Sequence, residues 1–204
     1  MLLAIDIGNT TTNFGVFARP DSRFGGRAGE RGTLVRRFNI STQPRRPAGA
    51  VARDLKAAAH ARRLRLAGAS EVILCSVVPW MTTALERALR QAGTGPVRVV
   101  GRDVRVPLKN RYSRPKEGGQ ERLVGAYAAW REFGKGRGAR GGPPRPSTSK
   151  AGRGGRGKDC IVADFGTAVT IDLVTRRGEY LGGMIVPGLR MSLEALAART
   201  ALLP

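Results

Sequence analysis

The feature that most constrains this chain is a segment that occurs twice. Residues 3–12, LAIDIGNTTT, align without a gap on residues 161–170, IVADFGTAVT. The apolar strand positions match, Asp6 falls on Asp164, and Gly8 falls on Gly166. Each copy continues into a second apolar stretch and then a third. A duplication at this distance predicts two similar domains and not a solenoid.

Each copy of the segment places a carboxylate and a glycine turn at the end of a predicted strand. A carboxylate at such a position can hold a hydrated Mg²⁺, and a glycine turn lets backbone N–H groups approach phosphate oxygens. One Asp-x-Gly turn alone is more typical of a plain hairpin. The duplication favours two phosphate-facing hairpins that clamp a nucleotide polyphosphate between them.

Apolar periodicity predicts an α/β order for the rest of the chain. Strands are expected at residues 2–6, 12–18, 33–40, 71–78 and 96–100. Helices are expected from Pro47 to about Leu66 and around Met81, Leu85 and Leu89. A second block has a helix after Gly119, strands at 161–164, 167–174 and 180–186, and a final helix from Leu189. We therefore expect one domain over residues 1–116 and a second over residues 117–204.

The charge of the chain is strongly positive, with 36 Lys and Arg against 15 Asp and Glu and a net charge of +21. Such a charge is typical of nucleic-acid or anion binding. Only 5% of the residues are aromatic and the arginines are scattered, so a polyphosphate substrate is favoured over nucleic acid. Residues 134–158 hold eight basic and no acidic residues, which predicts a disordered surface insertion. An RNA-binding role for this insertion is the alternative.

The sequence favours a cytoplasmic location. No apolar run reaches the roughly 18 to 20 residues that a membrane-spanning helix needs. The first apolar stretch is interrupted at Asp6 and reads as a strand and not as a signal peptide. Cys75 and Cys160 lie far apart beside apolar runs, which predicts reduced thiols in or near the core. The single histidine, His60, is expected to be an exposed structural residue.

Five ordered motifs carry a family resemblance. They are DIGNT at 6–10, SVVP at 76–79, a segment with Tyr112, Pro115, Gly119, Glu121 and Arg122, DFGTAVTID at 164–172, and YLGGMIVPG at 180–188. With these motifs in this order, the chain resembles the acetate and sugar kinase, Hsp70 and actin superfamily. More narrowly, it resembles the type III pantothenate kinases.

The resemblance implies an α/β fold of two actin-like (RNase H-like) domains that flank an ATP cleft. It implies transfer of phosphate from ATP to the primary hydroxyl of pantothenate, the first step of coenzyme A biosynthesis. It also implies Mg²⁺, a monovalent cation such as K⁺ or NH4⁺, and a homodimer. Family members continue beyond the position of Pro204, so the second domain is expected to be incomplete at its C-terminus, with apolar side chains exposed on the last helix.

The resemblance also assigns site residues by motif. The ATP phosphates are expected to contact Asp6, Ile7, Gly8, Asn9, Thr10, Thr11, Thr12, Asn13 and Thr167. Asp6 would also hold Mg²⁺ through water, and Asp164 the monovalent cation. Pantothenate is expected at Tyr112, Gly119, Gln120, Glu121 and Arg122. The alternatives are that Tyr112 packs a loop and that Arg122 is a solvated residue at a helix start.

One position departs from the family pattern. The family's general base is an aspartate in a Gly-x-Asp-Arg motif, and Glu121 stands at that position here. Glutamate has similar basicity but is one methylene longer, so it keeps the chemistry and changes the reach. Glu121 is the candidate base. The alternatives are a shifted alignment at this position, and an impaired or non-catalytic nucleotide-binding relative with a regulatory role.

Overall fold

The structure is a computed structural model that describes residues 1–18, 32–114, 118–135 and 157–200. Its contacts divide the chain into two compact units, Met1–Arg105 and Val106–Pro204. The expected domain boundary after residue 116 lies outside the described residues, as does most of the expected insertion at 134–158.

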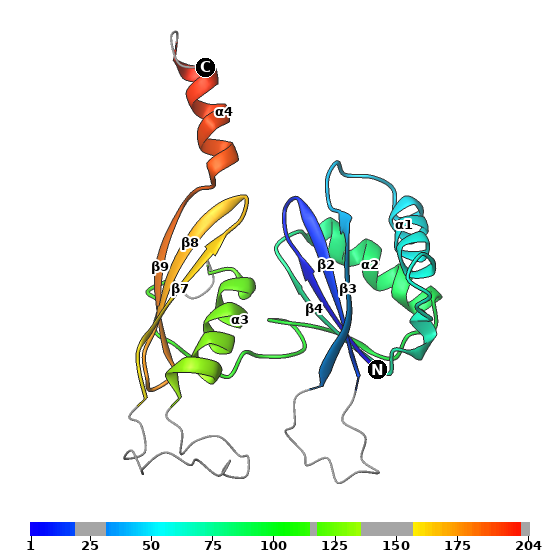
Figure 1. The fold of residues 1–204 in the computed structure, drawn as a ribbon, viewed down its shortest axis with the longest axis horizontal. Helices are drawn as coiled ribbons and strands as arrows, with labels where there is room; N and C mark the ends of the chain where they lie inside the picture. Colours follow the sequence, from blue (N-terminus) through cyan, green and yellow to red (C-terminus); the bar gives the residue numbers. More distant parts are fainter. Residues whose placement is uncertain (19–31, 115–117, 136–156, 201–204) are drawn as a thin grey trace, which may run out of the picture. The chain divides into compact units, whose positions relative to one another are not determined.

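The first unit is built on a mixed five-stranded sheet (Figure 1). Its strand order is β3-β2-β1-β4-β5, with antiparallel pairs from β1 to β3 and parallel pairs from β1 through β4 to β5. The strands are β1 (Leu2–Ile7), β2 (Thr11–Ala18), β3 (Thr33–Ser41), β4 (Glu71–Ser76) and β5 (Val97–Val99). Alternation in β1 buries Leu3, Ile5 and Ile7 and leaves Asp6 exposed. The sheet therefore presents Asp6 at the surface, one residue before β1 ends.

Two helices, α1 (Ala48–His60) and α2 (Pro79–Gln91), cover one face of this sheet (Figure 1). Each buries an apolar stripe at helical spacing, including Val51 and Leu55 on α1 and Leu85 and Leu89 on α2. The helix expected through Leu66 ends earlier, at His60. The chain turns there through Arg63, whose φ is 52°, into a short 3-10 turn, η2 (Leu66–Gly68).

The second unit is built on a four-stranded sheet with the order β6-β9-β8-β7. Its strands are β6 (Lys109–Asn110), β7 (Cys160–Phe165), β8 (Ala168–Val174) and β9 (Glu179–Pro187). Helix α3 (Gln120–Ala129), which continues as a π-helical turn, η3 (Trp130–Gly134), covers one face of this sheet (Figure 1). Its small core holds Leu123, Ala126, Val174 and Tyr180. The strand β6 was not expected from the sequence, because two residues are too few to show periodicity.

Much apolar surface is exposed in the second unit. Helix α4 (Leu189–Arg199) extends from the end of β9 (Figure 1), and none of its residues is buried. Leu189 is 76% exposed and Leu193 54%, and on β7 Ile161 and Phe165 are 75% and 79% exposed. The exposed apolar side chains expected on the last helix are therefore present.

At the level of fold class, the prediction is confirmed: the chain is mixed α/β with two sheets, consistent with an actin-like fold. The expected location of the thiols is also confirmed, since Cys75 is buried and Cys160 is partly buried, both as reduced cysteines. His60 is exposed, as expected. No helix among the described residues is long and apolar enough to cross a bilayer.

Candidate functional site

The first candidate phosphate site is the turn between β1 and β2. Gly8 donates its backbone N–H to the carbonyl oxygen of Thr11 at 3.1 Å, and a Cβ at Gly8 would lie 3.2 Å from that oxygen. The β1–β2 register places Asp6 opposite Asn13. Both side chains are exposed, as are those of Asn9 and Thr10 in the turn. The hairpin thus presents a carboxylate, amides and a hydroxyl at one end of the sheet.

Buried contacts hold this turn in place from inside the core. Ile7 and Thr12 are 1% and 0% exposed. The Thr12 and Thr42 hydroxyls lie 2.8 Å apart, and the Thr42 backbone N–H donates to the carbonyl oxygen of Thr10 at 2.9 Å. The side chains of Ile7 and Thr12 therefore support the turn from inside the core. If these residues contact phosphate as expected, they would do so through backbone atoms, and this contact stays a prediction.

The SVVP motif forms the loop beside this turn. Val77 donates its backbone N–H to the Ile7 carbonyl oxygen at 3.1 Å. The Ser76 hydroxyl accepts hydrogen bonds from the Val78 N–H at 2.9 Å and from the Thr82 hydroxyl at 2.7 Å. These bonds tie the start of α2 to the end of β1, so the motif fixes the backbone next to the hairpin.

The second candidate turn, between β7 and β8, resembles the first but is shorter. Asp164 and Thr167 are both exposed, and Gly166 donates its N–H to the Ala168 carbonyl oxygen at 3.0 Å. In the first hairpin Asp6 is paired with Asn13, and the gapless alignment places Asp164 on Asp6 and Ile171 on Asn13. The alignment therefore predicts that Asp164 pairs with Ile171, but its partner in the structure is Thr170. The repeat therefore holds along the first strand of each hairpin and slips by one residue along the second.

Gly188, at the start of α4, packs directly on this second turn. Its N–H donates to the Thr167 carbonyl oxygen at 3.0 Å, and a Cβ there would collide with the carbonyl oxygens of Gly166 and Thr167. Only glycine allows this approach of two backbones. The last residue of the YLGGMIVPG motif thus supports the turn that carries Thr167.

The candidate base, Glu121, lies in the first turn of α3. Its carboxylate folds back over Gly119, the residue that precedes the helix, so closely that a Cβ on Gly119 would overlap it. Glu121 is partly buried.

Next to Glu121, Arg122 forms a buried ion pair. Arg122 and Asp172 are 6% and 3% exposed, and the guanidinium donates to the carboxylate from Nε at 3.1 Å and from Nη2 at 2.5 Å. The Tyr180 hydroxyl donates to the same carboxylate at 2.7 Å. The hydrogen bonds from Arg122 to Asp172 raise the pKa of Arg122. The pKa of Tyr180 is raised mainly by burial and secondly by its own hydrogen bond to Asp172. Arg122 stays charged and Tyr180 stays neutral at neutral pH.

This arrangement contradicts one of the two interpretations of Arg122 made from the sequence, that of a solvated residue at a helix start. The guanidinium is buried, and Asp172 occupies two of its donors. Its expected contact with pantothenate stays a prediction. Sequence reasoning missed Asp172 and Tyr180, although Asp172 ends the DFGTAVTID motif and Tyr180 begins the YLGGMIVPG motif.

Tyr112 packs on β9. The Tyr112 backbone N–H donates to the Asn110 side-chain oxygen at 3.0 Å. The Tyr112 ring lies against Gly182, where a Cβ would overlap the ring. Gly182 also has a φ of 90°, a conformation that favours glycine. A Cβ on Gly118 would be 3.8 Å from the same ring. The structure therefore brings Tyr112 together with the segment that starts α3, as the motif assignment requires, and also gives the tyrosine a packing role.

The described residues contain no group of three or more His, Cys, Asp or Glu side chains that would hold a metal ion. Asp6 and Asp164 instead stand singly at the ends of their strands. Mg²⁺ commonly binds through one or two carboxylates together with water and substrate phosphates. The oxygen donors of Asp6 and Asn13 fit that kind of site.

Comparison with known proteins identifies relatives over almost the whole chain. The family profile described as Type III pantothenate kinase matches residues 2–138 and 149–204. The chain is 34% identical to the type III pantothenate kinase of Moorella thermoacetica and 35% identical to that of Geobacter sulfurreducens, each over 100% of this chain and 66% of the relative. The enzyme of Rubrobacter xylanophilus is 35% identical over 100% of this chain and 64% of its own. The chain thus spans about two thirds of the length of these relatives.

Proposed function

This chain belongs to the type III pantothenate kinase family, and we propose that it transfers phosphate from ATP to the primary hydroxyl of pantothenate. The observation that carries the proposal is the family match over residues 2–138 and 149–204. The product, 4'-phosphopantothenate, begins coenzyme A biosynthesis. We also propose that the protein is a cytoplasmic homodimer. Each chain would fold as two actin-like domains around an ATP cleft, with the boundary between the domains near residue 116.

The two hairpins would bind the polyphosphate. Phosphoryl transfer leaves a protein mainly the tasks of positioning and charge stabilisation. The turn at Gly8 offers backbone N–H groups, with Asn9 and Thr10 exposed beside it, and Thr167 is exposed on the second turn. Mg²⁺ would neutralise charge on the phosphates, held through water by Asp6, and Asp164 would bind K⁺ or NH4⁺.

Glu121 would accept the proton of the pantothenate hydroxyl as the oxygen attacks the γ-phosphorus. The bond from that phosphorus to the β–γ bridging oxygen breaks, and ADP leaves. Asp172 fixes Arg122, and Arg122 directly follows Glu121 on α3, so the buried ion pair holds the helix turn that carries the base. The remaining contacts to pantothenate would come from Tyr112 and the start of α3.

The direct test measures ADP formation by the full chain with ATP, Mg²⁺, K⁺ and pantothenate. We expect turnover that requires pantothenate and yields a phosphomonoester visible by ³¹P NMR. ATP binding is measured separately by calorimetry. If ATP binds and no pantothenate-dependent turnover occurs, the kinase proposal is wrong and the chain is a non-catalytic relative.

Replacing Gly119 with alanine tests whether the position of the Glu121 carboxylate matters. Gly119 has φ −61° and ψ 140°, which any residue adopts, so alanine causes no backbone strain. Its Cβ would displace only the end of the flexible Glu121 side chain. We expect kcat to fall by about 10- to 100-fold, because displacing a reacting group by about 1 Å costs up to 10²-fold.

Gly125→Ala on the same helix is the matched control for Gly119→Ala. A Cβ on Gly125 would meet nothing within 4 Å. Glycine inside a helix is less stable than alanine by about 0.5–1 kcal/mol, so this variant should be slightly more stable and keep its kcat. Equal kcat values for the two variants would contradict the positioning role.

A further inference from the structure

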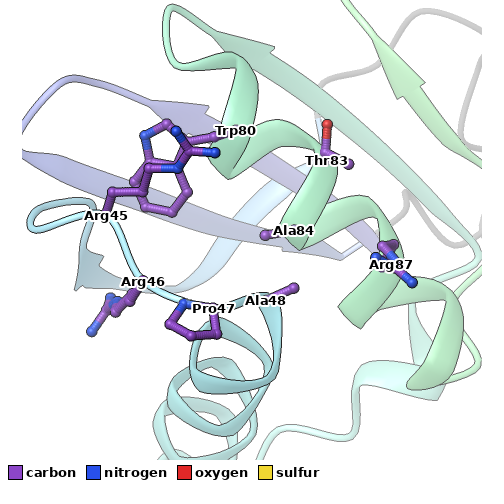
Figure 2. A pocket seen from close by; sticks show the side chains of 8 residues that line it. All are labelled: Arg45, Arg46, Pro47, Ala48, Trp80, Thr83, Ala84 and Arg87. Atoms are coloured by element: carbon purple, nitrogen blue, oxygen red, sulfur yellow. The ribbon is translucent and has the colours of Figure 1, made fainter.

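We propose that a groove between the starts of α1 and α2 binds an organic phosphate, that is, a phosphomonoester carried on an apolar or aromatic group. The groove lies wholly within the first unit and has a volume of about 620 Å³. Figure 2 shows Arg45 and Arg46 on the loop before α1, Ala48 at the start of α1, and Trp80, Ala84 and Arg87 on α2. Small-molecule sites commonly have volumes of about 300–1,000 Å³.

Two of the three arginines in the groove are available for an anion. Arg46 is already engaged, since Nη1 lies 2.6 Å from the Asp54 carboxylate and Nη2 donates to the Ser41 carbonyl oxygen at 2.5 Å. Arg45 and Arg87 are exposed, and neither has an ion pair or side-chain hydrogen bond within the described part of the chain. Each of these guanidinium groups can bind phosphate oxygens through forked, charge-assisted hydrogen bonds, and both add positive charge to the groove.

Both helices add positive potential at the same place. Helix α1 begins after Pro47 and α2 begins at Pro79, and in these described helices the first turns contain no acidic residue and no side-chain cap. The positive ends of both helix dipoles are therefore uncompensated. No carboxylate lines the groove among the residues that the structure describes. Its electrostatics consequently favour an anion over a cation or a neutral ligand.

The other lining side chains select a ligand that is more than an inorganic ion. Trp80 is half-buried, and Pro47, Ala48 and Ala84 extend the apolar wall beside it. Aromatic rings stack on tryptophan, and arginine also stacks on aromatic faces. A phosphomonoester on an aromatic group uses the cations and the apolar wall at once.

The groove is separate from the proposed ATP site on the hairpin. None of its lining residues belongs to the turn at residues 8–10. The loop that carries Arg45 follows Thr42, whose N–H donates to the Thr10 carbonyl oxygen. A ligand in the groove therefore lies one loop away from the hairpin and does not occupy it.

The test titrates the full chain with phenyl phosphate by calorimetry at low salt. Because hydrogen bonds to charged groups contribute about 1.5–3 kcal/mol, we expect Arg45→Gln and Arg87→Gln each to weaken binding by at least about tenfold. Arg90→Gln is the matched control, since Arg90 lies on the same helix outside the groove and is 73% exposed. Its affinity should stay within about twofold of the unsubstituted chain. Thermal midpoints verify that all three variants fold.

Further ligands and one hairpin variant decide between the proposal and its competitors. Phenol and inorganic phosphate should each bind at least about tenfold more weakly than phenyl phosphate. Equal binding of inorganic phosphate, or equal weakening by Arg90→Gln, overturns the proposal in favour of non-specific attraction. Loss of binding in Asn9→Ala would assign the phosphate to the hairpin. Tighter binding of a single-stranded oligonucleotide that also requires Arg90 would assign the groove to nucleic acid.

Discussion

Glu121→Gln is expected to lower kcat for pantothenate phosphorylation by about 10²- to 10⁴-fold, the usual contribution of a general base. Glutamine keeps the size and the hydrogen-bonding reach of the side chain but cannot accept the proton. ATP affinity, measured by calorimetry, should change little, because Glu121 belongs to the start of α3 and not to either hairpin. Initial rates of ADP formation at saturating ATP and pantothenate give kcat.

Glu121→Asp separates the need for a carboxylate from the need for its reach. Aspartate is the residue that the family motif carries at this position, so we expect kcat to stay within about tenfold of the original value. Glu194→Gln, on the exposed helix α4, removes the same charge from the same unit and should leave kcat unchanged. A Glu121→Gln variant that keeps full activity would show that another group takes the proton.

The sequence predicted the hairpins well because their signal is local. The alternation of β1 sets which side chains are buried, so the exposure of Asp6 follows from the pattern of Leu3, Ile5 and Ile7. The turn at Gly8 is likewise predicted by local sequence, because a glycine followed by small polar residues is typical of a turn. The one-residue slip between the two hairpins was not predictable, because it depends on which carbonyl the glycine N–H reaches, Thr11 in one and Ala168 in the other.

The surroundings of the candidate base were only partly predictable, because they depend on contacts between distant segments. Arg122 and Asp172 are separated by 50 residues, and Tyr180 approaches from the next strand. A single sequence gives the three residue types but not their distances. Likewise, the groove at Arg45 and Arg87 arises only when the starts of two helices meet, and no motif marks it.

The second unit buries two charged side chains, Arg122 and Asp172, beside a small apolar core. Burial of these charges is tolerated because each is paired with the other. Within the described part of the second unit, four residues form the buried apolar cluster, namely Leu123, Ala126, Val174 and Tyr180. Arg122 and Asp172 lie beside them on α3 and β8 and join the helix to the sheet. The pair is therefore a direct, buried link between α3 and β8.

Asp172→Asn should therefore destabilise the second unit by about 3–5 kcal/mol, the typical result of leaving one partner of a buried pair uncompensated. Arg122 cannot relieve the cost by losing its proton, because a guanidinium group stays protonated in proteins even without an acidic partner. Hydrogen–deuterium exchange of the α3 and β8 amides localises the loss, and we expect exchange to be about 10²- to 5 × 10³-fold faster at those amides whose exchange requires opening of the unit.

Two further variants distinguish a structural pair from one that also serves catalysis. Arg190→Ala breaks the exposed Arg190–Glu194 pair in the same unit and should cost less than about 1 kcal/mol. Replacing both buried partners, Arg122→Met with Asp172→Leu, should recover most of the stability, because a well-packed apolar pair can substitute for a buried ion pair. If that double variant also recovers kcat, Arg122 and Asp172 matter only for folding. If stability returns and kcat does not, the charged pair positions Glu121 or contacts pantothenate. A lower kcat at unchanged KM for pantothenate in the double variant indicates positioning, and a raised KM indicates contact.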